Sequence, residues 1–166
     1  MTPDASLTSH PVLVVELSCL AATEAFGRRL GGLLFPGAVI ALIGPLGAGK
    51  TQLVRAVAEG LGIKNSRAVT SPTFVLIQEY DARLPIYHFD TYRLARERDF
   101  VDLGIQEYFE GGGVCLIEWA DRVERSLPEE YLRLAFEVTG ETTRRLTVQA
   151  FGRPYEEIVQ RLGAAQ

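Results

Sequence analysis

A glycine-rich run between a strand pattern and a helix pattern constrains the fold of this chain more than any other feature. The run reads Gly44-Pro45-Leu46-Gly47-Ala48-Gly49-Lys50-Thr51 and fits G-x-x-x-x-G-K-[ST]. Residues 38–43 before it are all apolar, which is typical of a strand that helices cover on both faces. Residues 51–61 after it have the apolar spacing of an amphipathic helix. Strand, glycine loop and helix in this order form the context in which the pattern binds phosphate groups.

Each fixed position of the run meets a physical need of a nucleotide triphosphate site. The glycines let backbone N–H groups turn toward the phosphates, and the helix that begins near Lys50 directs its positive dipole end at them. Lys50 is predicted to bridge the β and γ oxygens as a catalytic cation, and the Thr51 hydroxyl to bind Mg²⁺. The residues predicted to contact the nucleotide here are Gly44, Leu46, Gly47, Ala48, Gly49, Lys50, Thr51 and Gln52. The alternative is a plain glycine-rich turn.

The absence of a guanine-recognition motif narrows the choice of nucleotide. The GTPase motif N-K-x-D is absent, since Asn65 is the only asparagine and Ser66 follows it. We therefore predict ATP and Mg²⁺ as the cofactors.

The remaining patterns extend this unit into an α/β fold. Strands are predicted at residues 11–17, 74–80, 85–89 and 113–118, helices at 21–34 and 155–162, and mainly helical or irregular structure at 94–109. Residues 131–138 and 144–150 alternate around a turn, which predicts an antiparallel hairpin. The sequence thus predicts the three-layer α/β fold of P-loop NTPases, with a mixed, mostly parallel sheet and a C-terminal antiparallel hairpin. We expect residues 1–10 to be a flexible N-terminal tail and residues 11–166 to form a single P-loop ATPase domain.

Charge and cysteine content limit the classes of partner and compartment. The formal net charge is -4, from 21 acidic and 17 basic residues, so the field of the whole molecule does not attract nucleic acid or an anionic membrane. The N-terminal segment lacks a basic region, and Glu16 interrupts the apolar run that follows, which predicts neither a signal peptide nor a membrane span. Cys19 and Cys115 are expected to be buried, reduced thiols, as in a cytoplasmic protein.

Two acidic residues end apolar strand patterns. Asp90 follows Pro85-Ile86-Tyr87-His88-Phe89, and Glu118 follows Gly113-Val114-Cys115-Leu116-Ile117. Because strands that stop at an acid deliver it to the carboxyl edge of the sheet, where ligands bind, both are predicted to be catalytic beside Lys50. Phosphoryl transfer needs a carboxylate that supports the metal and a group that orients water. The alternative for each is that it only solvates a strand end.

A loop rich in hydroxyl groups lies between the predicted phosphate-binding helix and the next strand. Its sequence, residues 69–74, contains Ser71 and Thr73 and lies where nucleotide-sensing switch loops often occur. An ordinary turn would have the same appearance. Trp119, directly after Glu118, either belongs to the core or lines the γ-phosphate pocket.

The remaining charged side chains near these motifs are assigned simpler roles. His88 alternates with apolar residues, so we expect it to face a neighbouring strand rather than to act as a base. Arg93 is the best internal cation near the predicted site. Arg144 and Arg145, with Arg96 and Arg98, are expected on solvated faces or in partner contacts.

Taken together, four ordered motifs resemble the bacterial TsaE (YjeE) family, the small ATPase of tRNA threonylcarbamoyladenosine synthesis. They are Gly44-Pro-Leu-Gly-Ala-Gly-Lys-Thr51, Ser71-Pro-Thr-Phe74, His88-Phe-Asp-Thr-Tyr-Arg-Leu94 and Ile117-Glu-Trp119. The resemblance covers about residues 17–121, and the predicted hairpin beyond it agrees with the family's architecture.

The resemblance implies roles for the motif residues and implies partners. Thr51 and Glu118 would hold Mg²⁺, and Asp90 would assist through a metal-bound water or as the base for hydrolysis. Residues 71–73 would form a nucleotide-responsive loop, with Trp119 close to the phosphates. A TsaD-type (Kae/Gcp) threonylcarbamoyl transferase and a TsaB-type companion would be the partners, and this chain would use ATP to drive or reset their cycle. It would meet tRNA only indirectly through the complex, and it would not associate with a membrane.

Two departures from the family pattern and two rival functions stay open at the level of sequence. Pro45 stands where the family commonly has Asp, and Ala120 stands where proline is usual. A small P-loop metabolite kinase is the enzymatic alternative, although such kinases generally need an arginine-bearing lid where this chain has a predicted hairpin. A nucleotide-gated interaction subunit with little turnover is the other alternative.

Overall fold

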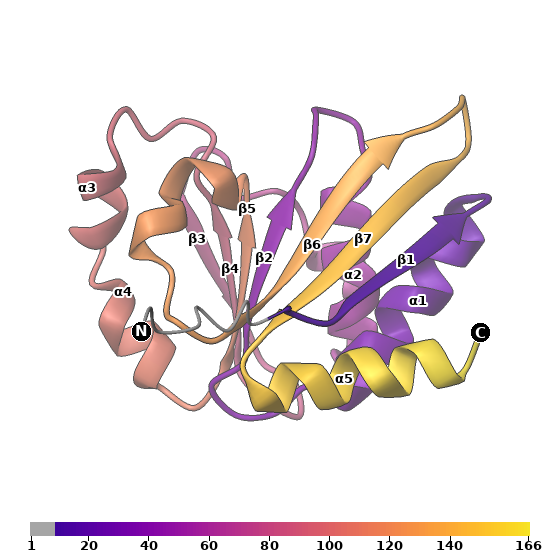
Figure 1. Ribbon diagram of the computed structural model, residues 1–166. Coiled ribbons are helices and arrows are strands. Elements are labelled where there is room, and N and C mark those ends of the chain that lie inside the picture. Colours follow the sequence, from indigo (N-terminus) through magenta and orange to yellow (C-terminus); the bar gives the residue numbers. More distant parts are fainter. Residues whose placement is uncertain (1–8) are drawn as a thin grey trace, which may run out of the picture.

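The computed structural model describes residues 9–166, which form one seven-stranded mixed sheet with helices on both faces (Figure 1). The strand order is β1-β7-β6-β2-β5-β4-β3. Most of the expected N-terminal tail, residues 1–8, lies outside the described residues. None of the helices within residues 9–166 combines the length and apolar character that a membrane crossing requires.

The elements follow one another in the order that the sequence patterns predict. The strands are β1 (Val12–Leu17), β2 (Val39–Ile43), β3 (Ile77–Tyr80), β4 (Ile86–Asp90), β5 (Val114–Glu118), β6 (Tyr131–Val138) and β7 (Arg144–Phe151). The α-helices are α1 (Leu20–Leu33), α2 (Lys50–Gly60), α3 (Glu97–Val101), α4 (Ile105–Glu110) and α5 (Arg153–Ala164). Two 3₁₀ helices, η1 (Ser66–Ala68) and η2 (Ala120–Ser126), complete the chain.

Parallel strands form the centre of the sheet and antiparallel pairs form its flanks. Strand β2 lies between β5 and β6 and is parallel to both, and β5 is also parallel to β4. The hairpin of β6 and β7 is antiparallel as predicted, and antiparallel pairing extends further to β1 on one edge and to β3 on the other. Because the carboxyl ends of β2, β4 and β5 meet at one edge, the segments that follow these strands are brought together there.

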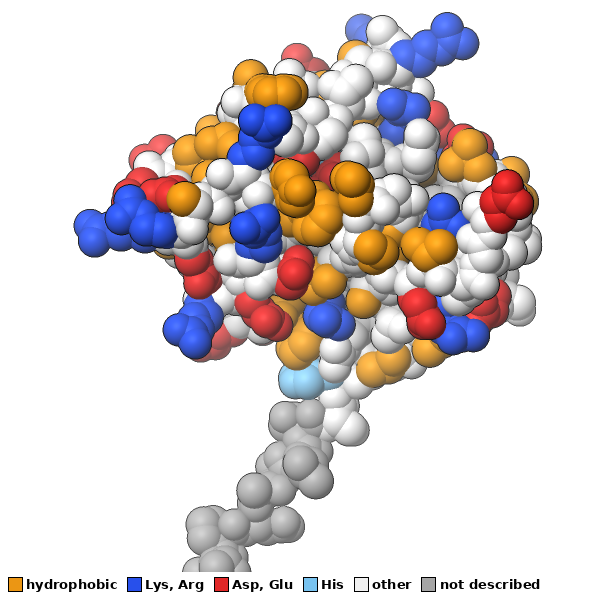
Figure 2. All heavy atoms as spheres, turned by 90° about the horizontal axis from the view of Figure 1, so that it is seen from above, with side chains coloured by type: hydrophobic (Ala, Val, Ile, Leu, Met, Phe, Trp, Pro, Cys, Tyr) orange, Lys and Arg blue, Asp and Glu red, His pale blue; other side chains and the backbone are white. Residues whose placement is uncertain are grey.

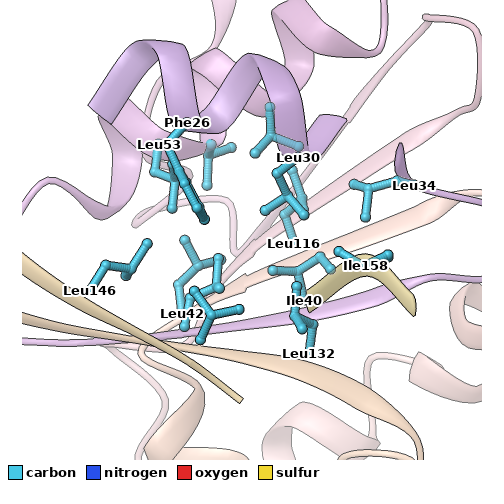
Figure 3. Close-up of a cluster of buried hydrophobic side chains, with 14 of the residues drawn as sticks. Phe26, Leu30, Leu34, Ile40, Leu42, Leu53, Leu116, Leu132, Leu146 and Ile158 are labelled. Atoms are coloured by element: carbon cyan, nitrogen blue, oxygen red, sulfur yellow. The ribbon is translucent and has the colours of Figure 1, made fainter. Parts of the chain in front are cut away.

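The larger hydrophobic core lies between one face of the sheet and helices α1, α2 and α5. Figure 3 shows Phe26 and Leu30 of α1 and Leu53 of α2 above Ile40 and Leu42 of β2. Strand β2 is buried along most of its length, as its uniformly apolar sequence predicts. This core fixes α2, and with it the preceding glycine-rich loop, against the middle of the sheet.

The second core covers the opposite face over β2, β4 and β5. Phe89 of β4 packs edge-on against Phe100 of α3 and Tyr108 of α4, and the 3₁₀ helix η2 contributes Ala120 and Val123. Together the two cores give the three-layer arrangement expected for a P-loop NTPase fold.

Two local expectations were wrong. The strand predicted from Phe74 begins only at Ile77, because Leu76 adopts a left-handed conformation (φ 69°) that bends the chain and leaves Phe74 exposed. Cys19 is exposed, whereas Cys115 is buried as expected. The physical reason is position: Cys19 lies between β1 and α1, where it is the residue before the first helical turn rather than part of an apolar strand.

Close packing of α1 against α2 yields a stability prediction. A Cβ atom at Gly31 would lie 2.3 Å from the backbone oxygen of Val57, whereas one at Gly32, in the same helix, would meet nothing within 4 Å. We expect Gly31→Ala to lower the free energy of unfolding by about 1–3 kcal/mol through overpacking. The matched variant Gly32→Ala should raise it by up to about 1 kcal/mol, because alanine restricts the unfolded chain. Urea unfolding measures both, and equal effects would contradict this account of the helix interface.

Candidate functional site

A cavity of about 480 Å³ opens at the edge of the sheet where β2, β4 and β5 end. All but one of the residues predicted from the sequence to bind nucleotide or act in catalysis line it: Leu46, Gly47, Ala48, Gly49, Lys50, Thr51, Gln52, Ser71, Thr73, Asp90, Glu118 and Trp119. Gly44 lies at the start of the loop, and its carbonyl oxygen accepts a hydrogen bond from Lys50. The fold therefore gathers four separate stretches of sequence around one hollow.

The glycine-rich loop has the conformation of a phosphate cradle. Gly47 and Gly49 have φ angles of 77° and 106°, in the region that favours glycine, and Gly49 directly precedes the first residue of α2. A Cβ atom at Gly47 would meet nothing within 4 Å, so this side of the loop faces open space. The first backbone N–H groups of any helix lack partners within the helix, and those of α2 begin at Lys50. These residues fit an anionic group such as a phosphate.

Lys50 is held at the mouth of this cradle. Its Nζ atom donates hydrogen bonds to the carbonyl oxygens of Gly44 and Pro45 and lies 4.0 Å from the ring centroid of Trp119. Burial lowers the pKa of Lys50, while the negative charges of Glu118, Asp121 and Asp90 act in the opposite direction. The partners of this ammonium group are two carbonyl oxygens and the face of a ring. Because phosphate oxygens carry charge and bind an ammonium group more strongly, they can replace these partners.

Glu118 joins the end of β5 to the start of α2. The Thr51 hydroxyl donates to its carboxylate, with Oγ1 at 2.9 Å from Oε1 and 3.2 Å from Oε2. Glu118 is only 3% exposed, so its charge is largely removed from water. A hydroxyl and a carboxylate side by side at the phosphate cradle are oxygen ligands of the kind that Mg²⁺ takes together with phosphate oxygens.

Asp90 anchors the loop that contains Ser71 and Thr73. Both hydroxyl groups donate to Asp90 Oδ2, that of Thr73 at 3.0 Å, and the backbone N–H of Tyr92 donates to Oδ1 at 2.9 Å. Asp90 pairs in register with Glu118 on the neighbouring strand. One carboxylate thus faces the loop and the other faces Thr51, with both at the same cavity.

Thr91 fixes the chain between Glu118 and Trp119, a role that sequence analysis missed. Its hydroxyl donates to the carbonyl oxygens of Trp119 and Glu118, at 2.7 and 3.1 Å. Trp119 has a left-handed backbone conformation (φ 58°), which costs a non-glycine residue about 1–3 kcal/mol and persists only where its surroundings impose it. The consequence is that the indole ring of Trp119 lies beside Lys50 and Tyr92 at the cavity.

Comparison with known proteins identifies the family of the chain. Residues 17–146 match the model of the family described as Threonylcarbamoyl adenosine biosynthesis protein TsaE. The chain belongs to the TsaE family. The tRNA threonylcarbamoyladenosine biosynthesis protein TsaE of Bacillus subtilis (strain 168) is 45% identical over 141 residues, which cover 84% of this chain and 87% of that protein. The protein of the same name from Treponema pallidum (strain Nichols) is 46% identical over 126 residues, or 76% of this chain and 92% of that one.

A solved structure also resembles the chain over nearly its whole length. The crystal structure of Bacillus subtilis YdiB superposes with a TM-score of 0.82 and 37% sequence identity, covering 95% of this chain and 97% of that chain. The predicted P-loop NTPase fold is thereby confirmed. The two departures from the TsaE pattern are compatible with the site, since the Pro45 carbonyl still accepts from Lys50 and Ala120 is buried in η2.

Arg144 corrects one prediction from the sequence. It was expected on a solvated face or in a partner contact, but from the start of β7 its guanidinium group donates to the carbonyl oxygens of Ala48, at 3.1 Å, and Gly47, at 3.3 Å. It also donates to Gly140 and Thr143 at the tip of the β6–β7 hairpin. Arg144 therefore braces the phosphate loop of this TsaE protein from outside. No local sequence pattern signals such a contact, because 96 residues separate Arg144 from Ala48.

His88 and Arg93 were placed only approximately by sequence. His88 does face the neighbouring strand, but its partner there is Glu118, with Nε2 at 2.8 Å from Oε1. Arg93 lies over the ring of Phe74, 4.1 Å from its centroid, rather than at the phosphate cradle. Lys50 is thus the cation that lines the cavity among the described residues.

The contact between Arg144 and the loop gives a testable outcome. Hydrogen bonds to a charged donor contribute about 1.5–3 kcal/mol, so Arg144→Ala should weaken ATP binding roughly tenfold by loosening the loop. Arg145→Ala is the matched control, because in the described part of the chain this neighbouring arginine pairs with exposed Glu16 and Glu137 and not with the loop. Isothermal titration calorimetry with Mg²⁺–ATP measures both affinities. If the two variants bind ATP equally well, Arg144 does not support the loop.

Proposed function

We propose that this TsaE-family chain is the ATP-binding and ATP-hydrolysing subunit of the tRNA threonylcarbamoyladenosine modification machinery in the cytoplasm. The observation that carries the proposal is the contact of Thr51 with Glu118 beside Lys50, at the mouth of a glycine-rich loop. This set combines an anion cradle, a buried cation and a pair of oxygen ligands for a metal. The family membership adds the pathway in which such a site would serve.

In the proposed site the loop residues bind and the carboxylates organise the reaction. Backbone N–H groups of Gly47, Gly49 and the first turn of α2 would hold the phosphates, while Lys50 would leave its carbonyl partners for the β and γ oxygens. Thr51 and Glu118 would hold Mg²⁺, which when bound neutralises charge that develops on the phosphate oxygens. Leu46, Ala48, Gln52 and Trp119 would complete the walls around the nucleotide.

Asp90, Ser71 and Thr73 would sense the state of the nucleotide. Asp90 is 2% exposed and already accepts hydrogen bonds from both hydroxyl groups, so it is held in one orientation at the cavity. From there it would orient the attacking water, directly or through the metal shell, and the loop of residues 71–73 would respond to the γ-phosphate.

The proposed partners are a TsaD-type transferase and a TsaB-type companion, with tRNA reached only through them. Large exposed apolar side chains lie close to the cavity mouth: Leu46 and Phe74 are each 81% exposed and Val75 is 61% exposed. Figure 2, which looks onto this edge of the sheet, shows hydrophobic side chains gathered near the middle of the face. Exposed apolar patches favour a protein contact. A net charge of -4 is consistent with a subunit that does not itself grip tRNA.

Replacement of Lys50 tests the nucleotide site directly. Lys50→Ala should abolish detectable ATP binding and turnover, because the cavity loses the cation that lines it among residues 9–166. Lys64→Ala is the matched control, since Lys64 is the one other lysine and is exposed away from this cavity. Calorimetry with Mg²⁺–ATP and phosphate release measure both properties. Unchanged binding by Lys50→Ala would remove the basis of the proposal.

A second variant separates the metal from the nucleotide. Glu118→Gln should lower Mg²⁺-dependent hydrolysis by at least tenfold while ADP binding without metal changes little, because only the metal ligand is weakened. The assay includes the TsaD- and TsaB-type partners, since a partner arginine changes such rates by about 10³ to 10⁵. Normal Mg²⁺ dependence in Glu118→Gln would reject the metal role of Glu118. Phosphorylation of a metabolite by the wild-type chain, or a strong preference for GTP, would favour a kinase or GTPase instead.

A further inference from the structure

A buried histidine contacts the carboxylate of the proposed metal site from behind. His88 lies in the middle of β4 and is fully buried, and its Nε2 atom is 2.8 Å from Glu118 Oε1. The same oxygen accepts a hydrogen bond from Thr51 at 2.9 Å. Glu118 is therefore held between a strand residue on one side and the first turn of α2 on the other.

The hydrogen bonds assign the proton of His88 to Nε2. Carboxylate oxygens accept hydrogen bonds, so Nε2–H of the imidazole is the donor to Glu118 Oε1. Within residues 9–166, Nδ1 of His88 is buried without a hydrogen-bond partner. The contact of the His88 ring with Glu118 therefore runs through Nε2 alone.

Packing alone does not explain this side chain. If this position only had to be filled, an apolar side chain would serve as well and would leave no buried nitrogen unpaired. Within residues 9–166, the one side-chain hydrogen bond of His88 instead goes to the carboxylate that touches Thr51. Buried metal-binding carboxylates are commonly held by hydrogen bonds of this kind, and loss of the partner costs about 10- to 100-fold in metal affinity or activity.

We propose that His88 is a positioning residue: its Nε2–H donates to Glu118 Oε1 and holds the carboxylate beside Thr51, and this sets the affinity of the site for Mg²⁺. The role rests on the proposed Mg²⁺–ATP site. His88 itself touches neither the metal nor the nucleotide in this assignment. It acts only by fixing the orientation of the Glu118 carboxylate and by limiting its motion.

Two polar substitutions separate this role from packing. In His88→Gln the amide nitrogen reaches about as far as Nε2 and can still donate to Glu118. In His88→Asn the side chain is also polar, but its amide ends near the position of Nδ1 and cannot reach Glu118. Both variants lose the imidazole ring, and only His88→Gln keeps a donor that reaches Glu118. A difference between them therefore reports on the hydrogen bond.

The test measures metal binding apart from turnover. Mn²⁺ serves as the paramagnetic probe, and its dissociation constant from the ADP complex is measured by electron paramagnetic resonance for wild type and both variants. ADP affinity in EDTA and urea unfolding are measured alongside. We expect His88→Asn to raise the Mn²⁺ dissociation constant about 10- to 100-fold, His88→Gln to stay within about threefold of wild type, and metal-free ADP affinity to change little in either.

Other outcomes overturn the assignment. Equal Mn²⁺ affinities in the two variants would show that the Nε2 hydrogen bond does not matter, whether both match wild type or both are weakened. A parallel loss of metal-free ADP affinity and stability in His88→Asn would show a structural role only. Wild-type protein that binds no ADP at all would refute the proposed function itself, which this design keeps distinct from failure of the role of His88.

Discussion

The parallel pairing of β2 with β5 is the constraint on which the rest of the site depends. It sets Leu42 opposite Glu118, so that the strand before the phosphate loop and the strand that ends in the carboxylate finish at the same edge. Only in this register does Glu118 face Thr51 across 2.9 Å. A slip of one residue would turn Glu118 to the opposite face of the sheet, into the core around Phe89 and Phe100.

Beside this pairing a buried polar network joins β4, β5 and the start of α2. Lys50, His88, Asp90, Thr91 and Glu118 are each at most 5% exposed, in a sheet whose other central residues are apolar. Burial of so many polar groups is costly unless they find partners. Lys50 and Thr91 donate to backbone carbonyl oxygens, His88 contacts Glu118, and Asp90 accepts from Ser71, Thr73 and the backbone N–H of Tyr92. Within residues 9–166, Nδ1 of His88 is the buried polar side-chain atom left without a partner. A site that stabilises charge needs polar groups in fixed orientations, which explains why the desolvation cost is tolerated here. The two hydrophobic cores on either face keep the strands in place around it.

Much of this arrangement could be predicted from sequence because its signals are local. The apolar run of β2, the glycine loop and the periodicity of α2 specify the phosphate cradle, and an acid at the end of an apolar strand indicated Asp90 and Glu118. The contacts that sequence missed depend on tertiary structure. Arg144 reaches Ala48 only because the β6–β7 hairpin packs beside β2, and the bond of His88 to Glu118 exists only between paired strands.

Backbone conformation was the other limit of sequence analysis. The left-handed residues Leu76 and Trp119 have side chains that do not favour this conformation, so no propensity indicates them. Yet Leu76 ends the loop of Ser71 and Thr73, and Trp119 turns its ring toward Lys50. Both conformations are imposed by neighbours, since Leu76 bonds to Pro72 and Asp90, and Thr91 bonds to the carbonyl of Trp119.

A crystal structure of the chain with Mg²⁺ and a non-hydrolysable ATP analogue is the most direct measurement of the central claim. The account predicts the β- and γ-phosphates within the loop of residues 44–51, with Lys50 on their oxygens and with Thr51 and Glu118 at the metal. A triphosphate bound elsewhere on the chain, or a metal in this loop that neither Thr51 nor Glu118 approaches, would contradict it.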